Sequence, residues 1–326
     1  MSAALEIENL QVTFGGRTAA VRGLSLSIQK GETHCLVGES GCGKSVSALA
    51  VMNLLARGAR RSVDKLELAG RDIAKLPERD FAKLRGDRMA MIFQEPMTSL
   101  NPAYTIGSQM TEVLRRHRGA SRAAAVERAA SLLDRVGITA PGVRLGQFPH
   151  QLSGGLRQRV MIAMALMCEP ELLIADEPTT ALDVTVQAQI LRLLAALQKD
   201  FGLAILLITH DLGIVARVAD NVSVMYAGEV VERASTAALF ADPAHPYTRG
   251  LLDCVPVPGK TAPGAVLGNI PGVVPAIAPG FAGCAFRNRC ALAIDACSAA
   301  VPVRRRDGGH AIRCLLPADQ RAGVPA

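Results

Sequence analysis

The chain has 326 residues, of which 49% are hydrophobic and 20% charged, so it can bury a sizeable core and is not intrinsically disordered. Its longest apolar stretches, Met161 to Cys168 and Leu203 to Ile208, are far shorter than the roughly 20 residues that a spanning helix needs. The N-terminal residues have neither a basic region nor an apolar run, so we expect no secretory signal and a cytoplasmic location. The formal net charge of +7 fits an anionic partner, a nucleotide or an ordinary solvated surface.

The first elements in chain order predict the start of a parallel α/β unit. Alternating polarity up to Phe14 indicates a half-buried strand, and a second strand is expected over 24–28. The apolar run 34–37 predicts a buried strand, and residues 45–56 have a helical pattern. A strand, a glycine-rich turn and a helix in that order are the first half of such a unit.

The later elements alternate between helical and strand patterns. A helical region is expected over about 97–168 and is clearest over 123–136. Strands are expected over 172–175 and 204–209, with a helix over about 186–198 between them. A hairpin is expected over 221–233, with its turn at Ala227 and Gly228. Prolines gather after about residue 240, which predicts an extended linker or a small loop-rich appendage. We therefore predict a domain over 1–240 and a C-terminal extension over 241–326.

The turn after the strand 34–37 has the full GxxxxGKS pattern of a phosphate-binding loop. Its glycines allow backbone N–H groups to face inward around phosphates, because a Cβ would obstruct that conformation. Lys44 is expected to reach the β- and γ-phosphates, and Ser45 to ligate Mg²⁺ at the start of a helix whose dipole favours anions. The loop consists of Gly38, Glu39, Ser40, Gly41, Cys42, Gly43, Lys44 and Ser45. The strand before it and the helix after it favour a nucleotide site over a merely glycine-rich turn.

Two acidic residues, Asp176 and Glu177, follow the apolar strand 172–175. A carboxylate at the C-terminal edge of a parallel sheet lies where such sheets place ligands. Asp176 is expected in the Mg²⁺ sphere, and Glu177 as the general base that polarises the attacking water. In isolation the pair also fits a helix cap, but a phosphate loop in the same chain favours the catalytic interpretation.

Three further positions each have a functional and an ordinary interpretation. Gln94 follows an apolar run and also fits a surface amide, while His210 also fits a strand-end residue with local hydrogen bonds. In the segment LSGGLRQR, Ser153 fits a helix N-cap, but the same helix N-terminus could bind a phosphate. Over a hundred residues separate Ser153 from the phosphate loop, so the two need not serve one nucleotide within one subunit.

Together these motifs resemble those of the ATP-binding cassette (ABC) ATPases. The resemblance implies a P-loop (RecA-like) α/β core with an antiparallel β subdomain and a helical subdomain, plus a small loop-rich C-terminal extension. It implies that two subunits sandwich two ATP molecules, each between one subunit's phosphate loop and the other's LSGG helix. The positions that match the family's motifs are Phe14, Gly38 to Ser45, Gln94, Ser153, Gly154, Gly155, Asp176, Glu177, Asp183 and His210.

The resemblance also implies a role for each matching residue. Phe14 would stack on adenine, although it also fits an ordinary strand residue. Gln94 would couple the Mg²⁺/water site to membrane subunits and join Ser45 and Asp176 around the metal ion. Asp183 would act across the dimer, and His210 would contact the γ-phosphate. The catalytic set implied is Lys44, Gln94, Glu177 and His210. Leu156 stands where the family often has Gln.

Three segments narrow the resemblance to importers of dipeptides, oligopeptides and nickel. They are residues 93–102, 245–252 and 270–272. This implies an ATPase that drives transmembrane transport of di- or oligopeptides, peripheral on the cytoplasmic face of the cell membrane. The implied partners are a second ABC ATPase subunit, two transmembrane permease subunits and an extracytoplasmic solute-binding protein. Import of nickel or another small solute is the alternative. A soluble ABC ATPase acting on nucleic acid is disfavoured, because the chain has one cassette and no long coiled-coil insertion.

Four of the eight cysteines, Cys284, Cys290, Cys297 and Cys314, lie in the last fifth of the chain. Zinc, an iron–sulfur cluster and unligated thiols all fit a reducing location. Zinc sites usually include a pair separated by two to four residues, which is absent here, so the spacing favours a cluster. The importer family includes members whose C-terminal cysteines ligate a 4Fe–4S cluster, and the resemblance implies the same here. The nearby Arg287, Arg289 and 304–306 are expected to face solvent rather than to tune the cluster.

Overall fold

The computed structural model describes residues 3–95, 99–180, 182–255 and 268–317, which fall into two compact units. The helical unit contains residues 1–5, 28–32 and 67–208, and the loop unit contains residues 6–27, 33–66 and 209–326. Each unit draws on separate stretches of the chain, so neither coincides with a simple N- or C-terminal segment. The boundary expected near residue 240 stays a prediction.

The helical unit contains three parallel strands, β7 (Met89–Ile92), β8 (Leu172–Asp176) and β9 (Ala204–Thr209). The first residues of the three strands pair with one another. All residues of β8 and β9 are buried, as continuous apolar runs require when both faces of a parallel sheet are covered. These two strands confirm the sequence prediction, whereas β7 is an addition.

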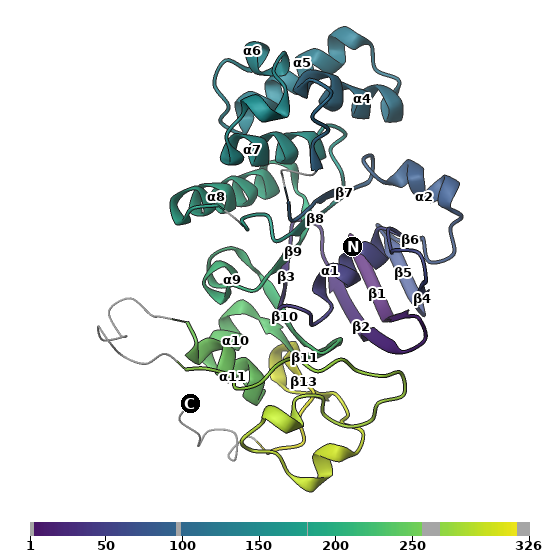
Figure 1. The fold of residues 1–326 in the computed structure, drawn as a ribbon, viewed down its shortest axis with the longest axis vertical. Coiled ribbons are helices and arrows are strands. Elements are labelled where there is room, and N and C mark those ends of the chain that lie inside the picture. The colour runs from purple at the N-terminus through teal and green to yellow at the C-terminus, as the bar shows by residue number, and fades with distance from the viewer. Residues whose placement is uncertain (1–2, 96–98, 181, 256–267, 318–326) are drawn as a thin grey trace. The chain divides into compact units, whose positions relative to one another are not determined.

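The helical region expected over about 97–168 is confirmed by α4 (Ile106–Arg118), α5 (Arg122–Arg135), α6 (Pro141–Leu145) and α7 (Gly154–Ala165). Helix α8 (Val184–Phe201) confirms the helix expected over about 186–198, and α2 (Glu78–Leu84) is an addition. Figure 1 shows α4, α5, α6 and α7 gathered together, and α5 packs against the other three. The buried side chains of α5 recur at Ala125, Ala129, Leu132 and Leu133, the spacing that keeps one helix face in the core. The short strand β6 (Arg71–Asp72) and a single helical turn at Pro149–Gln151 also belong to this unit.

The loop unit contains a second group of strands in the order β12-β13-β11-β10-β3. Its strands are β3 (Thr33–Val37), β10 (Asn221–Tyr226), β11 (Glu229–Ser235), β12 (Arg304–Arg305) and β13 (Ala311–Ile312). β3 and β10 are parallel, while β10 and β11 form the expected hairpin. The hairpin turns at Ala227 and Gly228 as predicted, and both residues have a positive φ. The short helix α9 (Leu212–Val218) precedes β10.

An antiparallel group of strands lies at the N-terminal end of the chain. It comprises β1 (Leu5–Phe14), β2 (Thr18–Ile28), β4 (Ala59–Ser62) and β5 (Lys65–Leu68). β1 lies between β2 and β5 and also pairs with β4. The second strand begins at Thr18 rather than at Leu24, because Arg22 and Gly23 interrupt the apolar pattern of its first half.

The helix α1 (Lys44–Val51) is shorter than the expected 45–56. Asn53 adopts a left-handed conformation, with φ of 53°. The Leu54 N–H donates to the Leu49 carbonyl and the Asn53 N–H to the Ala50 carbonyl, the two bonds of a Schellman ending. This local motif terminates the helix even though apolar residues continue beyond it.

The C-terminal extension belongs to the loop unit, and its described part is loop-rich as expected. Helix α10 (Thr236–Ala241) leads into the extension, whose described part contains α11 (Pro246–Asp253) and single turns at Arg287–Arg289, Asp295–Ser298 and Asp307–Gly309. Strand β13 adds to the edge of β11 and fixes the extension to the sheet (Figure 1). Among the described residues, no helix is both long and apolar enough to cross a membrane.

Candidate nucleotide-binding site

The phosphate loop, residues 38–45, connects β3 to α1 in the loop unit. A Cβ added to Gly38 would lie 2.2 Å from the Met225 carbonyl oxygen. At Gly43, which has φ of 106°, it would lie 2.3 Å from the Ala20 carbonyl oxygen. Both distances are far below van der Waals contact, so these glycines are required by the packing of the loop against its neighbours. The sequence motif predicted only their close approach to phosphates.

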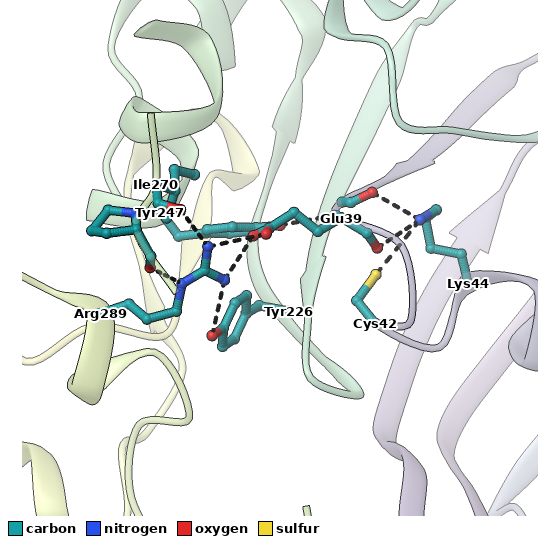
Figure 2. A network of polar contacts seen from close by, with 9 residues as sticks. Glu39, Cys42, Lys44, Tyr226, Tyr247, Ile270 and Arg289 are labelled. Atoms are coloured by element: carbon teal, nitrogen blue, oxygen red, sulfur yellow. Dashed lines mark hydrogen bonds and ion pairs between the residues drawn. The ribbon is translucent and has the colours of Figure 1, made fainter. Parts of the chain in front are cut away.

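Lys44 is folded back into its own loop and is only 5% exposed. Its ammonium donates to the carbonyl oxygens of Gly38 at 2.8 Å and Glu39 at 3.0 Å, and it lies 3.8 Å from Cys42 Sγ (Figure 2). Burial raises the pKa of the Cys42 thiol, and the Lys44 charge opposes that shift. A buried ammonium needs such partners, because leaving it unsolvated would be costly. The loop therefore holds a positive charge at the end of a buried strand.

The other predicted residues of the loop unit are more accessible. Ser40 and Gly41 are exposed at the tip of the loop, and Ser45 is partly exposed in the first turn of α1. His210 is exposed directly after β9. Phe14 is half-buried at the end of β1 and pairs with Ala59 of β4. The roles assigned to Phe14 and His210 stay predictions.

In the helical unit, Glu177 and Gln94 contact each other. Asp176 is buried at the end of β8, and Glu177 follows it with φ of 45°, a left-handed conformation that is uncommon outside glycine. Gln94 Nε2 donates to Glu177 Oε2 at 3.2 Å, and the Thr180 hydroxyl donates to the same oxygen at 2.8 Å. Two donors thus orient the Glu177 carboxylate, although Gln94 is 83 positions away in the sequence.

The LSGG segment and Asp183 occupy two helix N-termini of the same unit. Ser153 Oγ accepts from the Leu156 N–H at the start of α7, and Asp183 Oδ1 accepts from the Val186 N–H at 2.9 Å at the start of α8. A Cβ on Gly155 would lie 3.1 Å from Val186 Cγ1, so this glycine lets α7 approach α8 closely. The capping interpretation is therefore confirmed. Ser153 and Gly154 are also exposed, which leaves them accessible to a ligand.

The predicted site residues are therefore divided between the two units. The loop unit holds Phe14, the phosphate loop and His210, and the helical unit holds Gln94, the LSGG segment, Asp176, Glu177 and Asp183. Their meeting around one nucleotide stays a prediction. Of the segment 93–102, residues 96–98 lie outside the described residues.

The four C-terminal cysteines line one pocket in the loop unit. Cys284, Cys290, Cys297 and Cys314 surround it together with apolar side chains that include Phe286. Burial raises the pKa of Cys284 to about 11, and the three neighbouring thiols add to the shift. Within the described ranges, no three or more His, Cys, Asp or Glu side chains form a group that could hold a metal ion. The thiols thus share a pocket without forming a compact single-ion site.

Arg289 departs from the expectation that the arginines near the cysteines face solvent. Arg304, Arg305 and Arg306 are exposed as expected, whereas the Arg289 side chain is only 6% exposed. It is buried because it forms an ion pair with Glu39 of the phosphate loop. The two residues are 250 positions apart, so no local pattern in the sequence signals their contact.

Comparison with known proteins places the chain in a class. Residues 21–180, which include the phosphate loop and Asp176, match the family described as ABC transporter. A cassette of Clostridium perfringens, cbiO1, is 27% identical with a TM-score of 0.64, covering 74% of this chain and 92% of that one. A dimeric ATP-binding cassette, MJ0796, solved with ADP and Pi, is 26% identical with a TM-score of 0.62, covering 71% and 98%. The chain belongs to the ABC transporter ATPase family.

A second match defines the branch of that family. Residues 231–297 match the family described as oligopeptide/dipeptide transporter, C-terminal region. The dipeptide transport ATP-binding protein DppD of Bacillus subtilis is 47% identical over 327 residues, covering 99% of this chain and 97% of the relative. DppD of Escherichia coli is also 47% identical and covers 99% of both chains. The similarity therefore extends through the C-terminal extension as well as the cassette.

Proposed function

We propose that this chain binds Mg-ATP at the phosphate loop and hydrolyses it as the motor subunit of a di- or oligopeptide importer. The observation that carries the proposal is the buried Lys44 ammonium, which the loop holds on backbone carbonyls beside the N-terminus of α1. Membership of the ABC transporter family and likeness to DppD support it.

The loop residues would bind the triphosphate by exchanging partners. The Lys44 ammonium would leave the carbonyl oxygens of Gly38 and Glu39 for the β- and γ-phosphates, which are stronger, charged acceptors. The free N–H groups of the loop and of the first turn of α1 would complete the cradle. Ser45, Gln94 and Asp176 are the proposed Mg²⁺ ligands, and the bound ion would neutralise charge that develops on the phosphoryl oxygens.

Glu177 is the proposed general base. Its carboxylate already accepts from Gln94 and Thr180, so its orientation is fixed before a nucleophilic water arrives. Its left-handed backbone is a strained conformation of the kind that clusters at functional sites. Gln94 would link this carboxylate to the membrane subunits, and His210 would contact the γ-phosphate.

The second half of each nucleotide site would come from a partner ATPase subunit. The exposed N-terminus of α7, with Ser153 and Gly154, would contact the γ-phosphate held by that partner, and Asp183 would act across the same interface. The partner is proposed to be a homologous subunit or a second copy of this chain. Two permease subunits and an extracytoplasmic solute-binding protein complete the assembly, at the cytoplasmic face of the cell membrane.

The cysteine pocket is proposed to hold a 4Fe–4S cluster. The donor set fits, because four thiols and several apolar side chains surround one cavity. When bound, the cluster would cross-link Cys284, Cys290, Cys297 and Cys314 and supply a one-electron redox centre.

The test of the motor function is ATPase stimulation. We expect the purified chain and its partner ATPase subunit to hydrolyse ATP faster when detergent-solubilised permease subunits are added, and DNA or RNA to have no effect. Stimulation by nucleic acid alone would overturn the transport proposal. Anaerobic purification tests the cluster: visible iron–sulfur absorbance supports it, and colourless protein with stoichiometric zinc overturns it.

A further inference from the structure

The carboxylate of Glu39, the second residue of the phosphate loop, is held by an arginine from the C-terminal extension. Arg289 Nη1 lies 3.0 Å from Glu39 Oε1, and Arg289 Nη2 lies 3.0 Å from Oε2 (Figure 2). This is the two-pronged geometry that makes guanidinium–carboxylate pairs strong and directional. The second position of the phosphate loop is therefore tied to a segment beyond the cassette.

Arg289 is itself rigidly anchored. Its Nε donates to the Pro271 carbonyl at 2.7 Å, and Nη2 donates to the Ile270 carbonyl at 2.9 Å. Nη1 also approaches the Tyr226 hydroxyl at 3.3 Å. Burial alone would lower the pKa of Arg289, but the bonds to Glu39 and Tyr226 outweigh it and raise the pKa. The guanidinium thus remains charged in a largely buried place and connects three segments.

A second contact from the extension reaches the backbone of the same loop residue. The Tyr247 hydroxyl accepts from the Glu39 N–H at 2.9 Å (Figure 2). Tyr247 is fully buried and its ring packs edge-on against Tyr226, with centroids 4.7 Å apart. The extension therefore fixes both the side chain and the backbone N–H of Glu39, while the carbonyl of Glu39 holds the Lys44 ammonium.

The same contacts continue into the cysteine pocket. Phe286 lines that pocket and packs against Tyr226 and Tyr247, with centroids 5.2 and 5.3 Å apart. The Arg289 N–H donates to the Phe286 carbonyl at 2.9 Å, and Cys290 is the next residue in the chain. A continuous run of contacts therefore joins the cysteine pocket to the groups that touch Glu39.

We propose that Arg289 is a positioning residue for the phosphate loop and that it links ATP binding to the state of the cysteine pocket. This rests on the proposed binding of ATP at the loop. Without Arg289, the Glu39 carboxylate would be released next to the phosphates that it repels and to the Lys44 ammonium that it attracts. Both effects oppose ATP binding. Because linkage is reciprocal, bound ATP would alter the cysteine pocket to the same degree.

The first experiment measures the Kd for a fluorescent Mg-ATP analogue. We expect Arg289→Gln to weaken binding about tenfold, the size of a typical coupling between sites. Adding Glu39→Gln to that variant should recover much of the loss, because the released carboxylate is then absent. The Kd of Arg289→Lys should lie between those of wild type and Arg289→Gln, since lysine keeps the positive charge but cannot form the two-pronged contact with the carboxylate. Arg304→Gln, an exposed arginine of the same extension, is the matched control and should bind normally.

The outcomes separate the inference from the proposed function. If the wild-type chain fails to bind nucleotide, ATP binding at the loop is wrong. If it binds and Arg289→Gln has an unchanged Kd, the positioning role is wrong. If Glu39→Gln restores nothing to Arg289→Gln, the role assigned to the released carboxylate is wrong. Thermal melts verify that each variant is folded, and Arg289→Lys replaces Arg289→Gln if the latter is not.

The second experiment tests the link to the cysteines. Cys290→Ser should change the Kd for the Mg-ATP analogue in the wild-type background and leave it unchanged in Arg289→Gln. Conversely, in protein freed of metal, Mg-ATP should change the rate at which N-ethylmaleimide labels Cys290, and that effect should vanish in Arg289→Gln. Equal effects in both backgrounds, or none in wild type, would overturn the link. The labelling measurement needs no cysteine substitution, so it applies even if Cys290→Ser does not fold.

Discussion

At the residue scale, the Lys44 ammonium is already enclosed by the phosphate loop. The ammonium is buried and satisfied by two carbonyl oxygens of its own loop. Phosphate oxygens would replace those partners at little cost in reorganisation, since the side chain is already enclosed. Lys44 is therefore a side chain whose removal should affect nucleotide binding more than folding.

We predict that Lys44→Ala weakens Mg-ATP binding by about ten- to a hundredfold, the cost of losing a charged hydrogen-bond donor to phosphate. Titration with a fluorescent nucleotide measures the loss. Lys30→Ala, which removes an exposed lysine, is the control and should bind normally. Equal affinity of Lys44→Ala and wild type would show that the loop is not the nucleotide site.

Glu177 predicts a different kinetic pattern. Glu177→Gln keeps the shape of the side chain and removes its capacity to accept a proton. We therefore expect Mg-ATP to bind normally while single-turnover hydrolysis slows by about a hundred- to ten-thousandfold. Glu8→Gln, at an exposed position of β1, should hydrolyse ATP at the wild-type rate. Near-normal hydrolysis by Glu177→Gln would remove it from the role of base.

At the element scale, the extension is attached to β11 through the buried carboxylate of Glu232. This side chain is 0% exposed and accepts from the backbone N–H groups of Ala244 at 2.7 Å and His245 at 2.8 Å. It also lies 2.7 Å from His310 Nε2. Burial alone would raise the pKa of Glu232, but these hydrogen bonds, that of His310 first, outweigh it and lower the pKa.

This lowered pKa predicts how stability depends on pH. A carboxyl group with a depressed folded-state pKa stabilises the fold above its ordinary value of about 4.5, and the effect is lost as the pH falls through the folded value. Glu232→Gln should therefore reduce the free energy of unfolding by about 3 kcal/mol at pH 7, as breaking a buried charged network does. Thermal melts from pH 4 to 8 should show the difference shrinking at the acidic end. A difference independent of pH would contradict this assignment.

The cysteine pocket predicts low thiol reactivity. With a pKa of about 11, Cys284 is almost wholly protonated at pH 8. In protein freed of metal, iodoacetamide should label folded Cys284 on the order of a hundredfold more slowly than an unperturbed thiol. The rate should rise steeply towards pH 11, as quantified by mass spectrometry. Labelling at pH 8 as fast as in denatured protein would contradict the burial of this thiol.

Several elements could be predicted from the sequence because their signals are local. The buried strands β8 and β9 are uninterrupted apolar runs, and the β10–β11 hairpin has a glycine at its turn. Other elements have no comparable signal. β12 and β13 have two residues each, and they form because β13 pairs with the edge of β11 and β12 pairs with β13, while Asn53 ends α1 through its backbone conformation. Such elements depend on tertiary contacts that a pattern of hydrophobicity does not contain.

The candidate site divides in the same way. The phosphate loop and the pair Asp176 and Glu177 follow directly from motifs, and the structure places them at the start of α1 and at the end of β8 as expected. The contacts of Arg289 and Tyr247 with Glu39 could not be predicted, because each joins residues more than 200 positions apart. The charge of Arg289 predicted an exposed side chain, whereas the structure shows that it pairs with Glu39.

At the scale of the whole molecule, the extension and the phosphate loop belong to one compact unit. The match to the oligopeptide/dipeptide transporter C-terminal region covers Tyr247 and Arg289, both of which touch Glu39. Residues of the extension thus contact the phosphate loop directly. A motor built in this way would couple nucleotide binding to its extension as well as to its membrane partners.

Hydrolysis at this chain's phosphate loop is proposed to drive peptide import. The most direct measurement is uptake of a radiolabelled dipeptide into proteoliposomes that contain the permease subunits, this chain and its partner ATPase subunit, with the solute-binding protein outside and Mg-ATP enclosed. We predict uptake that needs Mg-ATP on the side of this chain and that is lost when Glu177→Gln replaces the wild type. Uptake that proceeds at the wild-type rate with Glu177→Gln, or without ATP, would contradict the account.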